Sequence, residues 1–135
     1  MDEHKQSQSI APSPYCLKLN FNVEFSRYII NMKKTKDDLF WMNKALKLAQ
    51  KAYDKNEVPV GCLIVEDNKI LSSAFNLKEN LQTPLGHAEV MAIHKDAKKK
   101  GSWRLENCTL YVTLETCPMC AGVILQSRIK KIVFA

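Results

Sequence analysis

TLYVTLETCPMCAG, residues 109–122, predicts a strand that leads directly into a helix carrying two thiols. Residues 109–114 alternate and are rich in β-branched and aromatic side chains, which is typical of a strand. Pro118 suits the first position of a helix because its missing N–H needs no partner there. Cys117 and Cys120 are three positions apart, a spacing that places them on one helix face. The partial positive charge of the helix start favours thiolates, so the pair predicts a metal site or a redox disulfide.

A single C-x-x-C pair has several explanations, and we weigh three of them. It is typical of a thioredoxin-like redox pair, of half a zinc ribbon, or of two ligands of a catalytic metal. A ribbon needs a second cysteine pair, and Cys16, Cys62 and Cys108 are too scattered to form one. The redox pair and the catalytic metal site remain open on this motif alone.

The segment His87-Ala88-Glu89 favours the catalytic metal site. Two thiolates and a neutral imidazole balance the charge of Zn²⁺ and leave a fourth position open for water. A carboxylate that does not bind the metal is the remaining requirement of a zinc hydrolase. Because positions two apart do not share a helix face, we expect the metal beyond the helix end, with Glu89 beside the water.

Length, charge and cysteine content limit the class of protein. A chain of 135 residues, 46% of them hydrophobic, fits one domain, and the formal charge of +6 permits nucleic acid as a partner without arguing for it. Five cysteines do not suit a secreted disulfide framework. No apolar run approaches the roughly 18 to 20 residues of a membrane span, and Asp2 and Glu3 do not suit a signal peptide. We therefore expect a cytoplasmic protein.

The chain divides into a leader and an α/β domain. Residues 1–36 keep no sustained period and predict an irregular or flexible leader, in which residues 17–25 alternate like an added edge strand. Met1 and Met32 are both candidates for the natural start. Residues 37–135 predict a three-layer domain with parallel pairing among the later strands. The expected elements are helix 37–54, which a capping box at residues 35–38 introduces, strands 58–65 and 69–75, helix 87–100, strand 109–114, helix 117–127 and strand 129–134.

The sequence pattern predicts packing or surface roles for several side chains. In helix 87–100 we expect the inner face to carry Val90, Met91 and Ala97. Other packing residues are expected to be Trp41, Trp103 and Met119, with Cys62 and Cys108 as small core residues. The cations at residues 98–100 suit a solvated helix end. The better candidates for phosphate contacts are Arg128, Lys130 and Lys131, although an edge strand in water also explains the two lysines.

Taken together, these motifs resemble the bacterial tRNA-specific adenosine deaminases of the zinc-dependent cytidine deaminase superfamily. The resemblance covers about residues 39–135. It is carried by five motifs: EVPVG (57–61), HAEVMAI (87–93), LYVTLE (110–115), CPMCAG (117–122) and SRI (127–129). It implies an α-β-α fold with a central mixed sheet, one zinc ion, a homodimer, and conversion of the wobble adenosine of a tRNA anticodon to inosine.

The same resemblance implies roles for single residues. His87, Cys117 and Cys120 would hold zinc, and Glu89 would shuttle protons as zinc-bound hydroxide attacks C6 of adenine. Three further residues would bind the flipped base: Asn76 by a hydrogen bond, Ala88 through its backbone N–H, and Val58 by lining the pocket.

Three departures from the family pattern stand out. Thr116 replaces the proline before the first cysteine, and Gly86 replaces a small residue with a β-carbon, which predicts a looser helix start. Family members also continue with another strand and terminal helices, so the chain reads as truncated at its C-terminal end, with stability, dimerisation and tRNA affinity in question.

Three other functions remain open. A deaminase of a free base such as guanine or cytosine would share the metal motifs without an RNA-binding surface. A shortened, inactive zinc-binding fold, or a subunit completed by another chain, would explain the missing elements. A redox protein would cycle Cys117 and Cys120 through a disulfide.

Overall fold

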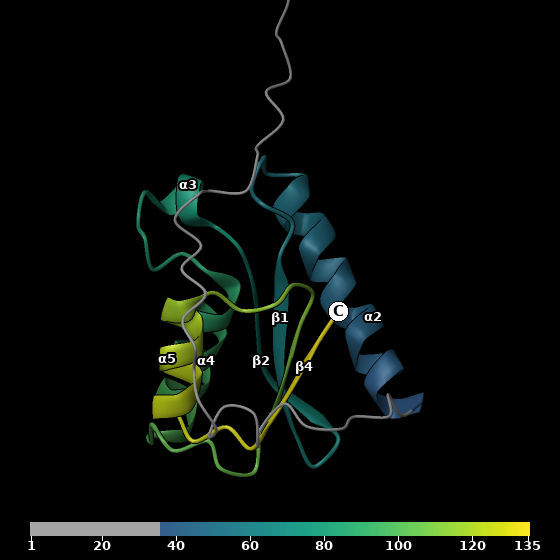
Figure 1. The fold of residues 1–135 in the computed structure, drawn as a ribbon, viewed down its shortest axis with the longest axis vertical. Helices are drawn as coiled ribbons and strands as arrows, with labels where there is room; N and C mark the ends of the chain where they lie inside the picture. Colours follow the sequence, from purple (N-terminus) through teal and green to yellow (C-terminus); the bar gives the residue numbers. More distant parts are fainter. Residues whose placement is uncertain (1–35) are drawn as a thin grey trace, which may run out of the picture.

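The computed structural model describes residues 36–135, so the predicted leader and its possible strand lie outside the described residues. The predicted helices and strands within this range are present, with bounds that differ by a few residues, and one short helix, α3, was not predicted. The elements, drawn in Figure 1, are α2 (Lys36–Tyr53), β1 (Gly61–Glu66), β2 (Lys69–Phe75), α3 (Lys78–Leu81), α4 (Ala88–Lys100), β3 (Thr109–Val112), α5 (Pro118–Gln126) and β4 (Lys131–Phe134).

The four strands form one sheet in the order β2-β1-β3-β4, and its mixed character agrees with the prediction. β1 pairs antiparallel with β2 and with β3, whereas β3 and β4 are parallel. The hairpin turn uses Asp67 and Asn68, both at positive φ, which matches the right-handed twist of the flanking strands. The parallel pair requires a crossover, and α5 supplies it.

Helices cover both faces of the sheet (Figure 1). α2 lies on one face, and α4 and α5 lie side by side on the other. Because successive strand residues point to opposite faces, Cys62 and Ile64 of β1 enter the core under α4 and α5, while Leu63 and Val65 enter the core under α2. The predicted three-layer arrangement is therefore confirmed, and Cys62 and Cys108 are core residues.

The packing of α2 on the sheet depends on two features far apart in the chain. A Cβ at Gly61 would collide with the backbone of Ala45 and Ala49, so glycine allows the helix to approach β1 closely. Asp38, 2% exposed, accepts a hydrogen bond from the Tyr111 hydroxyl at 2.9 Å and pairs with Lys131 Nζ at 2.8 Å.

This buried carboxylate changes the expected role of one cation. Burial, and then the hydrogen bond to Asp38, raise the pKa of Tyr111 and keep its hydroxyl a donor. Lys131, a candidate for phosphate contacts in the sequence, instead ties β4 to α2. Arg128 and Lys130 are exposed.

The predicted inner face of α4 is wrong for two of its three residues. Val90 and Ala97 line a surface groove between α4 and α5, whereas Met91 packs partly against the core. The buried face consists of Ala88, Glu89, Ala92, Ile93 and Asp96. The helix is nearly as apolar on its groove side as on its core side, so its periodicity could not distinguish the two.

Of the predicted packing residues, Trp41 is buried and Trp103 is 55% exposed, so the prediction is wrong for Trp103. Its ring lies at the end of the same groove, with Arg104 over it at 4.8 Å from the ring centroid. Met119 is half-buried in the groove wall.

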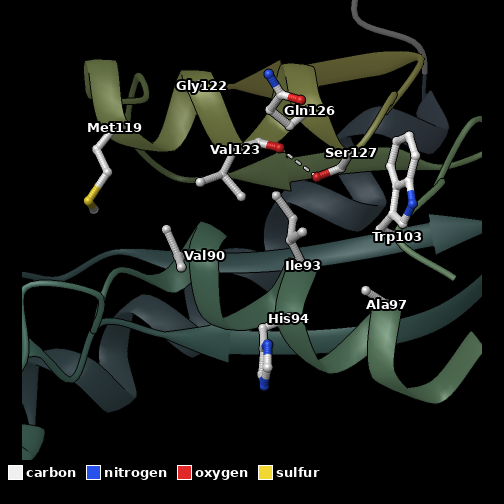
Figure 2. A pocket seen from close by; sticks show the side chains of 10 residues that line it. All are labelled: Val90, Ile93, His94, Ala97, Trp103, Met119, Gly122, Val123, Gln126 and Ser127. Atoms are coloured by element: carbon white, nitrogen blue, oxygen red, sulfur yellow. Dashed lines mark hydrogen bonds between the residues drawn. The ribbon is translucent and has the colours of Figure 1, made fainter. Parts of the chain in front are cut away.

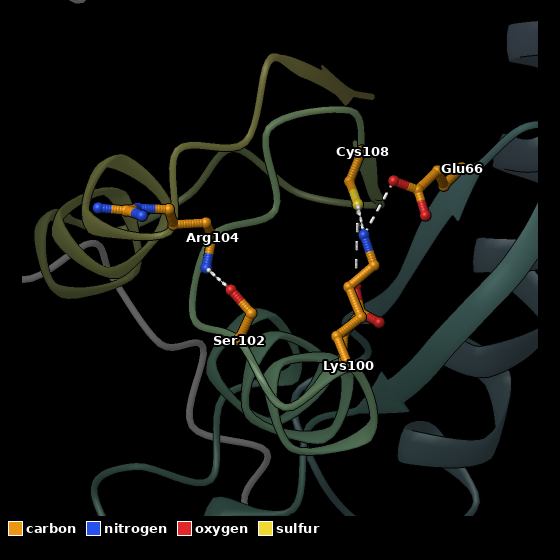
Figure 3. Close-up of polar contacts among 6 residues, drawn as sticks. Glu66, Lys100, Ser102, Arg104 and Cys108 are labelled. Atoms are coloured by element: carbon orange, nitrogen blue, oxygen red, sulfur yellow. Dashed lines mark hydrogen bonds and ion pairs between the residues drawn. The ribbon is translucent and has the colours of Figure 1, made fainter.

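The last turn of α4 is tied to β1 (Figure 3). Lys100 Nζ lies 2.8 Å from a carboxylate oxygen of Glu66 and 3.7 Å from Cys108 Sγ. Cys108 in turn donates to Asp96, which is fully buried. Lys100 therefore contributes to the fold and is not simply a solvated cation.

No helix within residues 36–135 combines the length and the apolar character needed to cross a bilayer.

Candidate active site and metal centre

The beginnings of α4 and α5 bring three potential metal ligands together. His87 and Cys117 are the N-cap residues of the two helices, both with extended backbone, and neither side chain caps its own helix. Both side chains can therefore point away from their helices toward a shared point. Cys120 lies in the first turn of α5 and completes a group whose ligand atoms are all within 4.8 Å of one another.

The distances in this group suit zinc. His87 Nδ1 lies 3.7 Å from Cys117 Sγ and 3.5 Å from Cys120 Sγ. Tetrahedral zinc, with Zn–S near 2.3 Å and Zn–N near 2.0–2.1 Å, requires nitrogen and sulfur ligands about 3.6 Å apart. Two thiols and one imidazole therefore fit the ion and supply only three of its four ligands. The imidazole faces the group with Nδ1, which the sequence did not specify.

Electrostatics make this group dependent on a cation. Burial, and then the negative charge of Glu89, raise the pKa of the Cys120 thiol above its ordinary value. Two helix starts point their partial positive charge at the group, and a bound cation deprotonates a coordinating thiol outright. The local charges thus favour binding of a divalent ion over an unpaired thiolate.

Glu89 lies beside the three ligands without belonging to their group. It is 4% exposed, sits in the first turn of α4, and lines a cavity of about 240 Å³ together with His87 and Cys117. Its negative charge also raises the pKa of Cys62, a smaller effect there than burial. A buried carboxylate next to a metal group is suited to accept and return protons.

The same cavity is also lined by the three residues that we expect to bind a base. Asn76 follows β2, is 7% exposed, and is held by its backbone N–H to Val60 O at 2.9 Å. Ala88 is the first residue of α4, where a helix N–H has no partner within the helix. Val58 is 56% exposed at the cavity wall. The structure thus places every predicted site residue around one point.

Sequence reasoning missed part of the wall. The cavity is also lined by Val60, Lys78, Leu114 and Glu115. Lys78 belongs to α3, which was not predicted because a helix of four residues is too short to show a helical period in the sequence. Glu57, behind Asn76, was part of a quoted motif but received no role.

Gly86 does not loosen the start of α4 as expected. It is buried, and an added Cβ would lie 2.6 Å from Lys78 Cα, so glycine allows α3 to lie against the residue that precedes His87. The first turn of α4 is regular, with Met91 N donating to His87 O at 3.0 Å.

A second, larger cavity of about 580 Å³ is the groove between α4 and α5 (Figure 2). It is lined mainly by apolar side chains, among them Val90, Ile93, Trp103, Met119 and Val123. Its only imidazole, His94, is exposed and has no acid or thiol beside it in the groove wall. The smaller cavity therefore carries the chemistry.

Comparisons with known proteins agree with this geometry. Residues 35–135 match the family described as the cytidine and deoxycytidylate deaminase zinc-binding region. The tRNA-specific adenosine deaminase of Bacillus subtilis (strain 168) is 49% identical over 100 residues, which are 74% of this chain and 62% of that protein. The chain thus spans less than two thirds of that relative.

Two solved structures have the same fold. One, from studies of A-to-I editing by tRNA:A34 deaminases at the wobble position of transfer RNA, has a TM-score of 0.70 and 34% identity and covers 73% of this chain and 75% of that chain. The other is guanine deaminase from Bacillus subtilis, with a TM-score of 0.70 and 35% identity over 72% of this chain and 62% of that chain.

Proposed function

Because this chain belongs to the family of cytidine and deoxycytidylate deaminase zinc-binding domains, we propose that it converts adenosine to inosine at the wobble position of a tRNA anticodon by hydrolytic deamination. The observation that carries the proposal is the convergence of His87, Cys117 and Cys120 with Glu89 at one end of a cavity. The identity to a relative named for this activity supports the choice of substrate.

The chain's own residues account for the proton transfers. Bound zinc supplies a Lewis acid that makes water nucleophilic near neutral pH. Glu89 accepts the proton that water loses as its oxygen adds to C6 of adenine, and delivers a proton to the adjacent ring nitrogen. It then supports protonation of the leaving amine, so that ammonia departs and inosine remains. Glu89 is only 4% exposed, which limits the contact of its carboxylate with bulk solvent.

Base recognition falls to three other residues that line the same cavity. Asn76 contributes a carboxamide, Ala88 a backbone N–H, and Val58 an apolar surface against which a flat ring can pack. The target base must leave its stack to enter, which is easiest in a single-stranded loop. An anticodon loop meets this condition.

The test measures inosine in an anticodon stem-loop with adenosine at the wobble position, with zinc content determined on the same sample. Formation of inosine in this stem-loop by the zinc-loaded protein supports the proposal, with no inosine expected in a stem-loop that carries guanosine at the wobble position.

The second candidate is a deaminase of a free base, which the similarity to guanine deaminase favours. Ammonia release from guanine or cytosine, without inosine in the stem-loop, would select that function instead.

We further propose that the chain acts as a homodimer whose interface uses the groove between α4 and α5. The groove is apolar, and an added Cβ at Gly122 meets nothing within 4 Å in the described part of the chain. Glycine inside a helix costs roughly 0.5–1 kcal/mol relative to alanine. Close approach of a second chain explains a glycine that the single chain does not need.

The cytoplasm, which is reducing and contains tRNA, is the proposed location.

A further inference from the structure

Glu57 is a buried carboxylate that receives only hydrogen-bond donors. It is 5% exposed and lies behind the base-binding wall of the cavity. One oxygen accepts from Asn80 through both its backbone N–H and its side-chain amide, each at 2.7 Å. The other accepts from Glu79 N at 3.2 Å and from Asn76 Nδ2 at 3.4 Å. Although burial acts in the opposite direction, the hydrogen bonds from Asn80 and Glu79, together with the charge of Lys78, hold the pKa of Glu57 below its ordinary value, so it is ionised at neutral pH.

The Glu57 carboxylate determines the orientation of the Asn76 carboxamide. With Nδ2 toward Glu57, one amide N–H is engaged; with the amide flipped, Oδ1 would face a negatively charged oxygen and repel it. Asn76 lies in the cavity wall, so the orientation decides which of its donors and acceptors a base meets. The backbone of Asn76 is held separately, by Val60 O.

The same carboxylate holds the segment that leads to the metal ligand. Its bonds to Glu79 and Asn80 anchor α3, and the residue preceding α3, Leu77, donates its N–H to Gly86 O at 2.9 Å. Gly86 has no room for a Cβ against α3 and directly precedes His87. The segment between the base-binding amide and the metal-binding imidazole is therefore anchored by Glu57 at α3 and closed by the backbone hydrogen bond between Leu77 and Gly86.

We propose that Glu57 is a positioning residue that sets the Asn76 carboxamide for base recognition and fixes residues 77–86 against the start of α4. The inference rests on the proposed function where it concerns the base, and on this chain's geometry alone where it concerns Asn76 and α3.

The first test is a double-mutant cycle on kcat/KM with the stem-loop substrate. Glu57→Gln keeps the shape of the side chain, but its amide opposes the donors of Asn76 or Asn80 and cannot accept from all of them. We expect kcat/KM to fall about 10-fold or more, mainly through KM, with zinc content unchanged. In an Asn76→Ala background the same substitution should have a much smaller effect. An equal fall in both backgrounds would overturn the proposal that Glu57 acts through Asn76.

The second test does not depend on activity. The side-chain amide signals of Asn76 and the backbone amide signals of Glu79 and Asn80 are compared by NMR in zinc-loaded wild type and Glu57→Gln. We expect all of them to shift and the Asn76 amide protons to exchange faster. Glu66→Gln, which removes a carboxylate paired with Lys100 away from the cavity, serves as the matched control and should leave these signals in place.

The two tests separate the two proposals. Inactivity of the wild type on the stem-loop, with the NMR changes present, would refute the tRNA function while retaining the positioning role. Unchanged Asn76 signals in Glu57→Gln would refute the positioning role whatever the substrate is.

Discussion

His87 Nδ1 lies 3.5 Å from Cys120 Sγ, although 33 positions separate the two residues in the chain. The approach arises because α4 and α5 lie side by side on one face of the sheet and begin at the same end (Figure 1). Each helix delivers its first residues to a common point, and the sheet face on which both helices pack sets the spacing. The chemistry of the site therefore depends on how two crossover helices pack.

Replacing Cys120 by alanine should remove most of the bound zinc, because two ligands cannot hold the ion as three do. Activity should be lost with it, and the melting temperature measured in excess zinc should fall. Zinc per chain is measured by atomic emission. Cys108→Ala removes another buried cysteine, away from the group, and should keep full zinc occupancy. Full occupancy in the Cys120 variant would contradict the ligand assignment.

Replacing Glu89 by glutamine should preserve zinc and fold while lowering kcat by about 10²- to 10⁴-fold, since only the proton-accepting group is removed. Inosine formation under single-turnover conditions, with zinc content on the same sample, provides the measurement. Glu115→Gln, at the exposed side of the same cavity, is the comparison. A fully active Glu89 variant would show that another group moves the protons.

Replacing Gly122 by glutamate should leave the monomer folded, because an added side chain meets no atom nearby, and should dissociate a dimer built on the groove. Sedimentation equilibrium reports the mass. Gly122→Ala should raise the melting temperature of the monomer, since it removes roughly 0.5–1 kcal/mol of helix cost. Asn43→Glu at an exposed position of α2, on the other face of the sheet, adds the same single charge and serves as the control. A dimer that persists in the glutamate variant would place the interface elsewhere.

Replacing Asp38 by asparagine should lower the free energy of unfolding by about 2 kcal/mol. The buried carboxylate holds both the Tyr111 hydroxyl and Lys131 Nζ, and an amide cannot balance the ammonium charge. Urea unfolding gives the value. The exposed neighbour Asp37 provides a matched substitution, Asp37→Asn, for which a change within about 0.5 kcal/mol is expected. An equal loss of unfolding free energy in Asp38→Asn and Asp37→Asn would contradict the stabilising role assigned to Asp38.

Asp96 should make stability depend on pH. Burial raises the pKa of its carboxyl, against the opposing charge of Lys100, and Oδ1 has no hydrogen-bond partner among the described residues. A raised pKa means that the folded state holds the proton more tightly, so this contribution to stability is fully present below the unfolded value of 3.8 and is lost as pH rises through the folded value.

The free energy of unfolding of Asp96→Asn relative to wild type should accordingly move in favour of the variant as pH rises from about 4 to 7. Urea unfolding across this range, with zinc content matched between the proteins, provides the measurement. A difference that stays constant with pH would indicate an ordinary pKa for Asp96.

Local patterns identified most of the fold. The alternation in residues 109–114, the Asp67-Asn68 turn and the Cys-Pro start of α5 each depend on neighbouring residues, so the sequence predicts them directly. The inner face of α4 was assigned wrongly because Val90 and Ala97 face an apolar groove instead of water. Periodicity records which positions are apolar, and it does not record which of two apolar surroundings each one meets.

By itself, the sequence determined the order of the helices and strands apart from α3, and the mixed sheet, and it predicted which residues bind a metal or move a proton. Only the tertiary structure decided that His87 uses Nδ1, that Lys131 belongs to Asp38, and that Glu57 supports both Asn76 and α3. The reason is physical. Helix starts, strands and turns follow from contacts between neighbours in the chain, whereas these pairings join residues 19 to 93 positions apart and exist only once both layers of helices have packed on the sheet.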